Sequence, residues 1–275
     1  MSRHGWVVLK LGGELLEDPV RLQALAAVVA RSAAVVPLAV VHGGGREIDM
    51  ALARAGLQKR QVDGLRITDA ATLDVVVEVL AGSINTRFVA AINAAGGQAV
   101  GLTGADARLA LVEPAPPHVG VDGSVTDLGF VGRPLGSRWP RLLLDLGEAG
   151  YVPVVASLGT SLEGALYNVN ADTLAAHLAG RLAASRLVIA GATPGVLDDR
   201  GRTLHELRRD GVAPLIASRV ASAGMVAKLR ACEDALAGGA AEVLLVDGRE
   251  PHVVESVLTA QPGHLPDAPF TRMVA

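Results

Sequence analysis

Residues 6–14 read Trp-Val-Val-Leu-Lys-Leu-Gly-Gly-Glu, and this stretch decides the fold class. The apolar residues from Trp6 to Leu9, two of them valines, are typical of a strand covered on both faces. Gly12 and Gly13 then allow a sharp turn. Lys10 is therefore expected near the carboxyl edge of a first strand, where ligands of open α/β sheets gather and where glycine amides help a lysine to hold anionic oxygens. For this stretch alone, a solvated lysine before an ordinary turn is an equal alternative.

The composition indicates a globular protein with a large core. Half of the 275 residues are hydrophobic, which argues against disorder. The net charge of -3 and the scattered arginines argue against a nucleic-acid partner. Cys232 is the single cysteine, so no internal disulfide can form and a reducing compartment is expected. No uncharged apolar run approaches the ~18 residues of a membrane span, and no signal-peptide pattern is present, so we predict a cytoplasmic protein without a membrane partner.

A strand, glycine loop and helix follow one another twice in the first sixty residues. Asp18-Pro19 predicts a helix start after the first glycine turn, with Leu22, Leu25, Ala26 and Val29 on one face. Residues 38–41 form a second apolar strand that leads directly into His42-Gly43-Gly44-Gly45 and another helix. Such a loop presents backbone amides at a helix N-terminus, where phosphate or carboxylate is favoured. Neither a G-x-G-x-x-G fingerprint nor a Walker loop is present.

The same alternation continues, with one interruption. A long helix over residues 69–93 is predicted, with Asp69 as its cap and Gly96-Gly97 at its end, followed by a third strand over 98–102. Burial inside its own lobe explains the helix's wide apolar face better than an oligomer contact does. Residues 109–133, rich in proline and glycine, predict short β pieces that project as a lid.

The second half of the chain predicts a second lobe. A helix over 141–149 and a strand over 152–155 precede a restart of the β/α pattern near residue 165. From there the pattern predicts a helix after Asn168-Val169-Asn170-Ala171-Asp172, a strand over 186–189, a turn over 193–197, a helix from Gly224 to Gly238, and a final core strand over 242–246.

Lys10, Lys228 and Asp172 each lie beside a predicted strand or helix edge, and together they suit phosphoryl transfer. The transition state spreads negative charge over three oxygens, which cations and aimed amides stabilise without a general base. Taken singly, Asp172 is better explained as a helix-capping acid and Lys228 as a solvated lysine. Arg66 could bind a substrate carboxylate or be an ordinary surface arginine. The seven histidines show no metal-ligand spacing, so we predict no bound transition metal, and Mg²⁺ would arrive with a nucleotide.

Seven motifs taken in order resemble those of the acetylglutamate kinases, which belong to the amino-acid kinase superfamily. They are Lys10-Leu11-Gly12-Gly13, His42-Gly43-Gly44-Gly45, Gly64-Leu65-Arg66-Ile67-Thr68, Asp127-Leu128-Gly129-Phe130-Val131-Gly132, Asn168-Val169-Asn170-Ala171-Asp172, Pro194-Gly195-Val196-Leu197 and Gly224-Met225-Val226-Ala227-Lys228. The resemblance covers nearly the whole chain and outweighs the single-residue alternatives. It implies a three-layer αβα sandwich with a mainly parallel sheet in two lobes, residues 1–165 for the amino acid and dimerisation and residues 166–275 for ATP.

The resemblance also implies an activity and a set of roles. The γ-phosphoryl of ATP, bound with Mg²⁺, would pass to the side-chain carboxylate of N-acetyl-L-glutamate, a step of arginine biosynthesis. Lys10 and Lys228 would stabilise the moving phosphoryl group, and Asp172 would orient both. The remaining implied roles are oxygen binding by Gly13, Gly44 and Gly45, amino-acid binding by Gly64, Arg66, Asn168 and Asn170, and nucleotide contact by Ala192, Thr193, Pro194, Gly195, Val196 and Leu197.

One departure from the family pattern keeps two alternatives open. Where the family usually has Thr/Ser-Asp-Val before the Pro-Gly-Val-Leu turn, this chain has Gly191-Ala192-Thr193 and lacks the acid. Residues 270–273 also match the family's closing strand only loosely. A weakened nucleotide site would suit a regulatory protein that binds acylated amino acids without phosphorylating them. A sibling kinase acting on an aminoadipate derivative is the other alternative.

The resemblance also bears on assembly. Arginine-inhibited members of the family resemble hexamers linked by an extra N-terminal helix, and members without that helix resemble plain dimers. Only Met1 to Gly5 precede the first strand here, too few for such a helix. The resemblance therefore implies a homodimer that arginine does not inhibit, joined mainly through the first lobe, with the helix of residues 69–93 as the leading candidate for its apolar contact.

Overall fold

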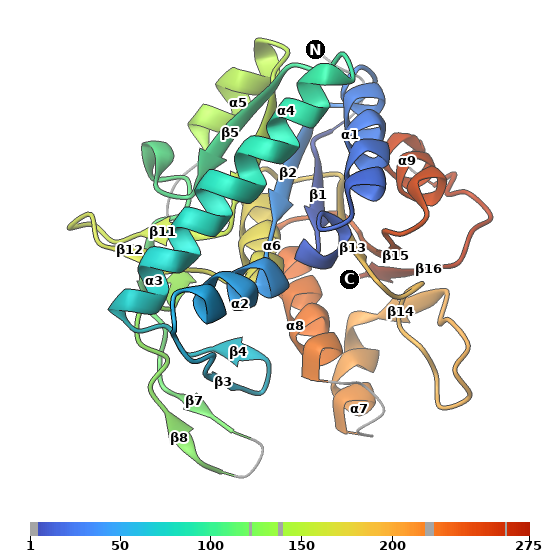
Figure 1. The fold of residues 1–275 in the computed structure, drawn as a ribbon. Helices are drawn as coiled ribbons and strands as arrows, with labels where there is room; N and C mark the ends of the chain where they lie inside the picture. The colour runs from blue at the N-terminus through green and yellow to red at the C-terminus, as the bar shows by residue number, and fades with distance from the viewer. Residues whose placement is uncertain (1–4, 121–122, 137–139, 218–222, 262) are drawn as a thin grey trace.

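The centre of the molecule is an eight-stranded sheet in the order β14-β16-β15-β13-β1-β2-β10-β5 (Figure 1). The computed structural model describes residues 5–120, 123–136, 140–217, 223–261 and 263–275. The six strands from β15 to β5 run parallel, while β16 is antiparallel to β15 and β14 is parallel to β16. The strands are β1 Val7–Leu11, β2 Leu38–His42, β5 Ala99–Thr103, β10 Val152–Ala156, β13 Arg186–Gly191, β14 Glu206–Arg208, β15 Val243–Asp247 and β16 Phe270–Val274.

Helices cover both faces of this sheet, so the predicted three-layer αβα architecture is confirmed (Figure 1). Alternate residues of β1 show the division, since Val7, Leu9 and Leu11 belong to one hydrophobic core and Val8 belongs to the other. On the first face α1 packs against α4 and α9, and on the second α6 packs against α8. The helices are α1 Pro19–Ala33, α2 Gly45–Arg54, α3 Ala70–Val77, α4 Thr86–Ala94, α5 Arg141–Glu148, α6 Ala171–Arg181, α7 Val212–Ala217, α8 Ala223–Gly238 and α9 Pro251–Thr259.

The predicted irregular region forms two short ribbons. Strand β6 (Val112–Pro114) pairs with β9 (Gly132–Pro134), and β7 (His118–Val119) pairs with β8 (Val125–Thr126). The β7–β8 ribbon projects from the body of the molecule in Figure 1, as the sequence predicts. Its role as a lid stays a prediction. Two further ribbons pair β3 (Gln61–Val62) with β4 (Leu65–Arg66) and β11 (Leu158–Thr160) with β12 (Leu166–Asn168).

The long helix predicted over residues 69–93 runs from Ala70 to Ala94, with Asp69 capping it through the amide of Thr72. Its middle differs from the prediction, because Glu78–Asn85 is a π-helix (η2) that inserts extra residues into the turn. The whole helix is long and apolar enough to span a membrane, with a mean hydropathy of 1.6 over its best window, although 44% of that window is buried inside the protein. A core helix passes the same criterion, so this is weak evidence, and location in the cytoplasm stays a prediction.

The sheet is continuous across the predicted lobe boundary. Residues before 166 supply β1, β2, β5 and β10, the later residues supply β13 to β16, and the two sets meet where β1 pairs with β13. The division into an amino-acid lobe and an ATP lobe stays a prediction. The core strand expected over residues 242–246 is confirmed as β15, but it is not the final strand, because β16 adds an antiparallel strand beside it and buries Thr271 and Met273. The expectation that no helix precedes the first strand concerns residues 1–5. Residues 1–4 lie outside the described residues, so this expectation stays a prediction.

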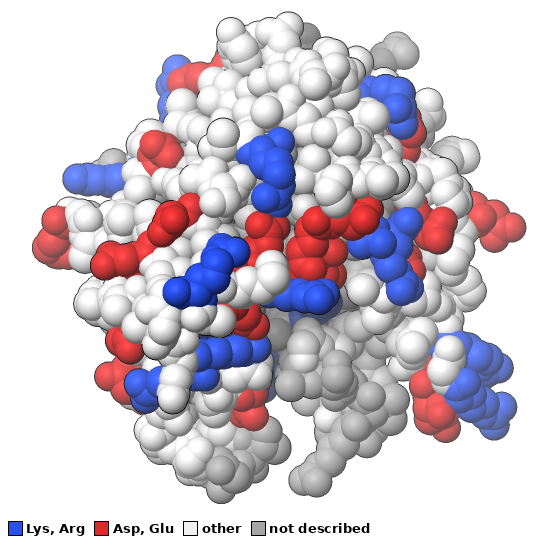
Figure 2. Space-filling view, viewed as in Figure 1, with Lys and Arg blue, Asp and Glu red and all other residues white. Residues whose placement is uncertain are grey.

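Charges of both signs mix on the molecular surface. Figure 2 shows Lys and Arg side chains interspersed with Asp and Glu on one face, where the described residues gather no basic surface of the kind that binds nucleic acid. The predicted lack of a nucleic-acid partner stays a prediction.

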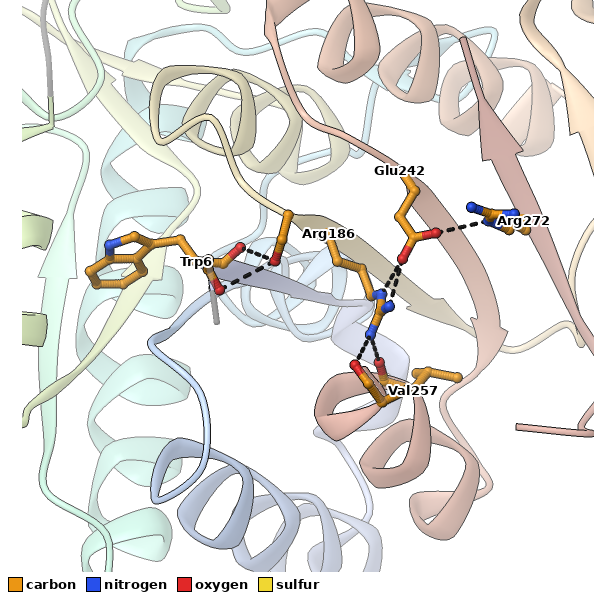
Figure 3. A network of polar contacts seen from close by, with 8 residues as sticks. Trp6, Arg186, Glu242, Val257 and Arg272 are labelled. Atoms are coloured by element: carbon orange, nitrogen blue, oxygen red, sulfur yellow. Dashed lines mark hydrogen bonds and ion pairs between the residues drawn. The ribbon is translucent and has the colours of Figure 1, made fainter. Parts of the chain in front are cut away.

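A buried ion network anchors α9 at the amino edge of the sheet, far from the carboxyl ends of the parallel strands. Arg186, the first residue of β13, donates to Glu242 Oε1 at 2.7 Å and to the carbonyls of Val257 and Ala260 at 2.5 and 3.1 Å. Arg272 of β16 donates to the second oxygen of Glu242 at 2.8 Å (Figure 3). Arg186 therefore satisfies both a buried carboxylate and the last carbonyls of a helix.

Replacing Arg186 with methionine is expected to lower the free energy of unfolding by about 3 kcal/mol, because the helix carbonyls and half of the Glu242 carboxylate lose their partner in the interior. Urea denaturation measures this change, and kcat should stay unchanged. Arg31→Met is the matched control: it removes an exposed ion pair between α1 and Glu255 of α9 and should leave stability nearly unaltered. Equal effects of the two substitutions would contradict the assigned role of Arg186.

Candidate active site

Two of the three lysines in the chain converge on Asp172 at the carboxyl edge of the sheet. Lys10 Nζ lies 2.8 Å from Asp172 Oδ1, and Lys228 Nζ lies 3.2 Å from Asp172 Oδ2. Lys10 follows Val8 on the face of β1 that α6 covers, and Asp172 is in the first turn of that helix. Lys10 and Asp172 are buried, whereas the Lys228 side chain is 21% exposed. The predicted trio therefore forms one cluster.

Charge pairing sets the protonation of this cluster. Burial alone would raise the pKa of Asp172, but the charges of Lys10 and Lys228 outweigh burial and lower it. Burial would lower the pKa of Lys10, and the carboxylate of Asp172 reverses this and raises it. The pKa of Lys228 is lowered, by burial first and by the charge of Lys10 second. The Asp172 carboxylate, with its pKa lowered, thus lies between the Lys10 and Lys228 side chains.

The two predicted glycine loops touch each other next to this cluster. A Cβ on Gly13 would lie 2.6 Å from the Cα of Gly44, so only glycine permits this approach. A Cβ on Gly43 would lie 3.3 Å from the Cβ of Ala171, the first residue of α6. The N-termini of α2 and α6 therefore converge here. The first amides of α2 have no partner within that helix, whereas Asn170 accepts from the Asp172 and Thr173 amides of α6. Amides, helix dipoles and ammonium groups together form an anion site.

Arg66 lies at the end of β4 with part of its guanidinium unused. Its Nη2 donates to Asp49 Oδ1 at 2.5 Å and to the Gly45 carbonyl at 3.1 Å, which joins Arg66 to the first turns of α2. Its Nη1 is buried and has no hydrogen-bond partner among the described residues. A buried, unpaired guanidinium nitrogen is costly, and an anionic ligand would satisfy it.

The chain is similar to known proteins over most of its length. The amino acid kinase family matches residues 5–247. Acetylglutamate kinase of Rhodopseudomonas palustris is 42% identical over 255 residues, covering 90% of this chain and 85% of that protein. Acetylglutamate kinase of Dinoroseobacter shibae is 39% identical over 248 residues, covering 90% and 83%. The chain belongs to the amino acid kinase family, among its acetylglutamate kinases.

Solved structures of other proteins share this architecture. N-acetylglutamate synthase from Neisseria gonorrhoeae, complexed with coenzyme A and N-acetyl-glutamate, superposes with a TM-score of 0.80 at 23% identity. The match covers 98% of this chain and 59% of the synthase. Carbamate kinase from Giardia lamblia bound to AMP-PNP superposes with a TM-score of 0.69 at 16% identity and covers 100% and 99%. At these identities the superpositions establish the fold alone.

The other residues predicted to bind the amino acid are Asn168, Asn170 and Gly64, and each has a different structural environment in this kinase. Asn168 donates to Thr68 Oγ1 at 3.2 Å, and Thr68 Oγ1 in turn donates to the Arg66 carbonyl at 3.2 Å, so Asn168 and Arg66 border one region. Asn170 uses its Oδ1 to cap α6, accepting from the amides of Asp172 and Thr173. Gly64 has a φ of +81° in the two-residue turn between β3 and β4. Their binding roles stay predictions.

The predicted nucleotide segment divides into exposed and buried parts. Ala192, Thr193 and Leu197 are exposed after the end of β13, and Pro194 is half-buried. Gly195 and Val196 are buried against β16, where the Val196 amide donates to Thr271 Oγ1 at 2.8 Å. Only the exposed residues of the segment are accessible to a nucleotide. The segment is held in place by β16, a strand that the sequence analysis did not predict to lie in the core.

Two residues near the glycine loops escaped the sequence analysis. The carboxylate of Glu14 lies against Gly12 and within 4.0 Å of a Cβ built on Gly191, close enough to the two lysines to favour their charged forms. His42 is completely buried at the end of β2. Both residues belong to the quoted motifs, so their proximity to the glycine loops could have been predicted from the sequence. The orientation of their side chains could not.

Proposed function

We propose that this chain transfers the γ-phosphoryl group of ATP to the side-chain carboxylate of N-acetyl-L-glutamate, giving the acyl phosphate used in arginine biosynthesis. The observation that carries the proposal is the Asp172 carboxylate held between Lys10 and Lys228, beside two converging helix N-termini, in a chain that belongs among the acetylglutamate kinases.

The residues suit an in-line displacement. A carboxylate oxygen of the amino acid attacks the γ-phosphorus, the bond from that phosphorus to the β–γ bridging oxygen breaks, and ADP leaves. The attacking carboxylate is already ionised at neutral pH, so no general base is needed. Lys10 and Lys228 stabilise the charge on the moving phosphoryl group, Asp172 orients them, and the amides of Gly13, Gly44 and Gly45 bind oxygens.

ATP would enter as its Mg²⁺ complex. The described residues contain no group of three His, Cys, Asp or Glu side chains spaced to hold a metal ion, and Asp172 is occupied by its lysines. This donor set fits a cation held mainly by the nucleotide's phosphates, where it would neutralise phosphate charge. The exposed residues Ala192, Thr193 and Leu197 would border the nucleotide, without the acid that the family usually carries at position 192.

At the amino-acid end, Arg66 and Asn168 would bind the non-reacting α-carboxylate side of the substrate. Arg66→Ala is expected to raise KM for N-acetylglutamate by about tenfold or more with a smaller change in kcat, because this contact exists equally in the ground and transition states. Steady-state kinetics with each substrate varied in turn measures this.

Lys59→Ala provides the control for Arg66. Lys59 Nζ contacts the other oxygen of Asp49 at 2.7 Å, so this variant disturbs the same carboxylate from outside the pocket and should leave KM nearly unchanged. A rise in the KM for ATP alone in Arg66→Ala would show that the pocket is wrongly assigned.

ADP release with a set of acceptors tests the proposed substrate. N-acetylglutamate should support turnover well above N-acetylaminoadipate and unacylated glutamate. Faster turnover of N-acetylaminoadipate would favour the sibling kinase. Binding of N-acetylglutamate without ADP release would favour the regulatory protein, a possibility raised by the missing acid at Ala192.

We also propose a homodimer formed through the helix Ala70–Ala94 and the neighbouring sheet edge. This helix carries half-buried apolar residues, Leu73, Val75, Val77, Ala81 and Val89, and it packs against β5, the last strand of the sheet, whose outer edge is open. Light scattering at micromolar concentration should give twice the monomer mass of 28.1 kDa. Ala81→Glu changes a half-buried residue of this helix and should shift the measured mass towards that of the monomer. An unchanged dimer mass would show that the interface lies on another part of the surface.

A further inference from the structure

His42 is a buried histidine without a role in the chemistry proposed above. It ends β2, directly before Gly43-Gly44-Gly45, and is completely buried. Burial, together with the charge of Arg87, lowers the pKa of His42 to about 4, and the hydrogen bond to the Gly43 carbonyl opposes this only in part. The imidazole is therefore neutral at physiological pH, with one ring nitrogen that donates and one that accepts.

Hydrogen bonds decide which nitrogen carries the proton. The Val154 carbonyl can only accept, and Asn85 Nδ2 lies 2.9 Å from it, so the amide nitrogen of Asn85 must face this side. The same Nδ2 lies 3.0 Å from His42 Nε2, which must then be the acceptor. The proton consequently resides on Nδ1, which donates to the Gly43 carbonyl at 3.2 Å.

The π-helix delivers Asn85 to this position. A Cβ on Gly101 would lie 2.2 Å from Asn85 Oδ1, so β5 makes room for the amide by having no side chain there. The same segment also supports the loop directly, since a Cβ on Gly44 would meet the Ile84 and Leu80 side chains at 2.3 and 2.9 Å. Segment η2 therefore contacts the Gly43–Gly45 loop in two ways, through the hydrogen bond of Asn85 to His42 and through the packing of Leu80 and Ile84 against Gly44.

We propose that His42 and Asn85 are positioning residues that aim the Gly44 amide at the transferring phosphoryl group. In a trans peptide the N–H of one residue points opposite to the C=O of the residue before it. By binding the Gly43 carbonyl, the Nδ1–H of His42 turns the Gly44 N–H away from the core and towards the anion site. The inference rests on the proposed function for the identity of that anion, and on the hydrogen bonds alone for the orientation.

Imidazole NMR on the wild-type protein tests the orientation without any turnover. Long-range ¹H–¹⁵N spectra between pH 6 and 8 should show His42 as the neutral Nδ1–H tautomer. The Nε2–H tautomer, which predominates in free histidine, or an imidazolium in this range would overturn the proposal. A wild-type protein that shows the expected tautomer but does not phosphorylate N-acetylglutamate would refute the proposed function and leave the positioning pair standing.

Kinetics of matched variants tests the consequence. Asn85→Leu removes both donated hydrogen bonds at nearly constant volume and should lower kcat about tenfold or more, with KM values changed less, because a misaimed amide weakens transition-state binding. Asn93→Leu is the control: Asn93 is on α4, bonds the backbone of Ala99 instead, and should leave kcat unaltered. Equal losses of kcat in Asn85→Leu and Asn93→Leu would show that Asn85 has only a structural role and would contradict the proposal.

Replacing His42 itself distinguishes the role of Nδ1 from that of Nε2. His42→Asn places an amide donor near the position of Nδ1, whereas His42→Gln places its amide near Nε2. His42→Asn should therefore keep several-fold more of the wild-type kcat than His42→Gln, compared at equal folded fraction by urea denaturation. A His42→Gln variant as active as the wild type would overturn the role of the Nδ1–H bond.

Discussion

Lys10→Ala and Lys228→Ala are each expected to lower kcat by about 10² or more, with smaller changes in both KM values. The charge that these lysines are proposed to stabilise is greatest in the transition state, so their loss should affect the chemical step more than binding. The structure supports this common role, because both ammonium groups contact the same carboxylate at 2.8 and 3.2 Å.

Burial separates the two lysine variants. Lys10 is buried, so Lys10→Ala also leaves a cavity, and its kcat must be corrected for any unfolded fraction measured in urea. Lys228 is partly exposed, so its variant should fold normally. Lys59→Ala, which changes the remaining lysine of the chain, should retain wild-type kcat. A Lys10 or Lys228 variant with near-wild-type kcat would remove that lysine from the mechanism.

Asp172→Asn is expected to reduce both activity and stability. The asparagine keeps the shape of the side chain, but two ammonium groups lose their counter-ion and Lys10 is left buried without compensation. Breaking a buried pair in this way costs about 3–5 kcal/mol of unfolding free energy. Without the carboxylate the pKa of Lys10 falls, so the alkaline limb of the kcat profile should move to lower pH.

The pH dependence of stability provides a second readout for Asp172. The pKa of Asp172 is lower in the folded protein than its ordinary value of 3.8, so its contribution is complete above that value and disappears as pH falls through the folded pKa. Unfolding free energies of wild type and Asp172→Asn should therefore differ most near neutral pH and converge in acid. A difference that persists unchanged at the lowest pH would show that cavity or packing effects, and not the ion pairs, cause the loss.

Parts of this site could be predicted from local sequence because backbone patterns determine them. Lys10 lies at a strand's carboxyl edge because four apolar residues precede it and two glycines follow. Asp172 was harder, since an acid in a first helical turn is usually explained as a cap. In the structure Asn170 caps α6, which leaves the Asp172 carboxylate available for the lysines. Pairing with residues distant in sequence carries no local signal, and the motif resemblance supplied what local reasoning could not.

The features that the sequence analysis missed depend on tertiary contacts. Residues 78–85 have ordinary helical apolar spacing, which does not signal a π-helix or the hydrogen bonds of Asn85 to β2 and β10. The antiparallel strand β16 is short and follows a loop, and its place is set by pairing with β15 and by the Thr271 contact to Val196. The tautomer of His42 depends on a carbonyl contributed by another strand. None of these partners is a neighbour in sequence.

Trapping the product is the most direct test of the central claim that phosphate passes to the side-chain carboxylate of N-acetylglutamate. Hydroxylamine converts an acyl phosphate into a hydroxamate, and mass spectrometry identifies which carboxyl group reacted. With ATP, Mg²⁺ and N-acetylglutamate, we predict the side-chain hydroxamate in amounts equal to the ADP released, and none with Lys10→Ala. ADP release without hydroxamate, or hydroxamate at the α-carboxyl group, would contradict the account.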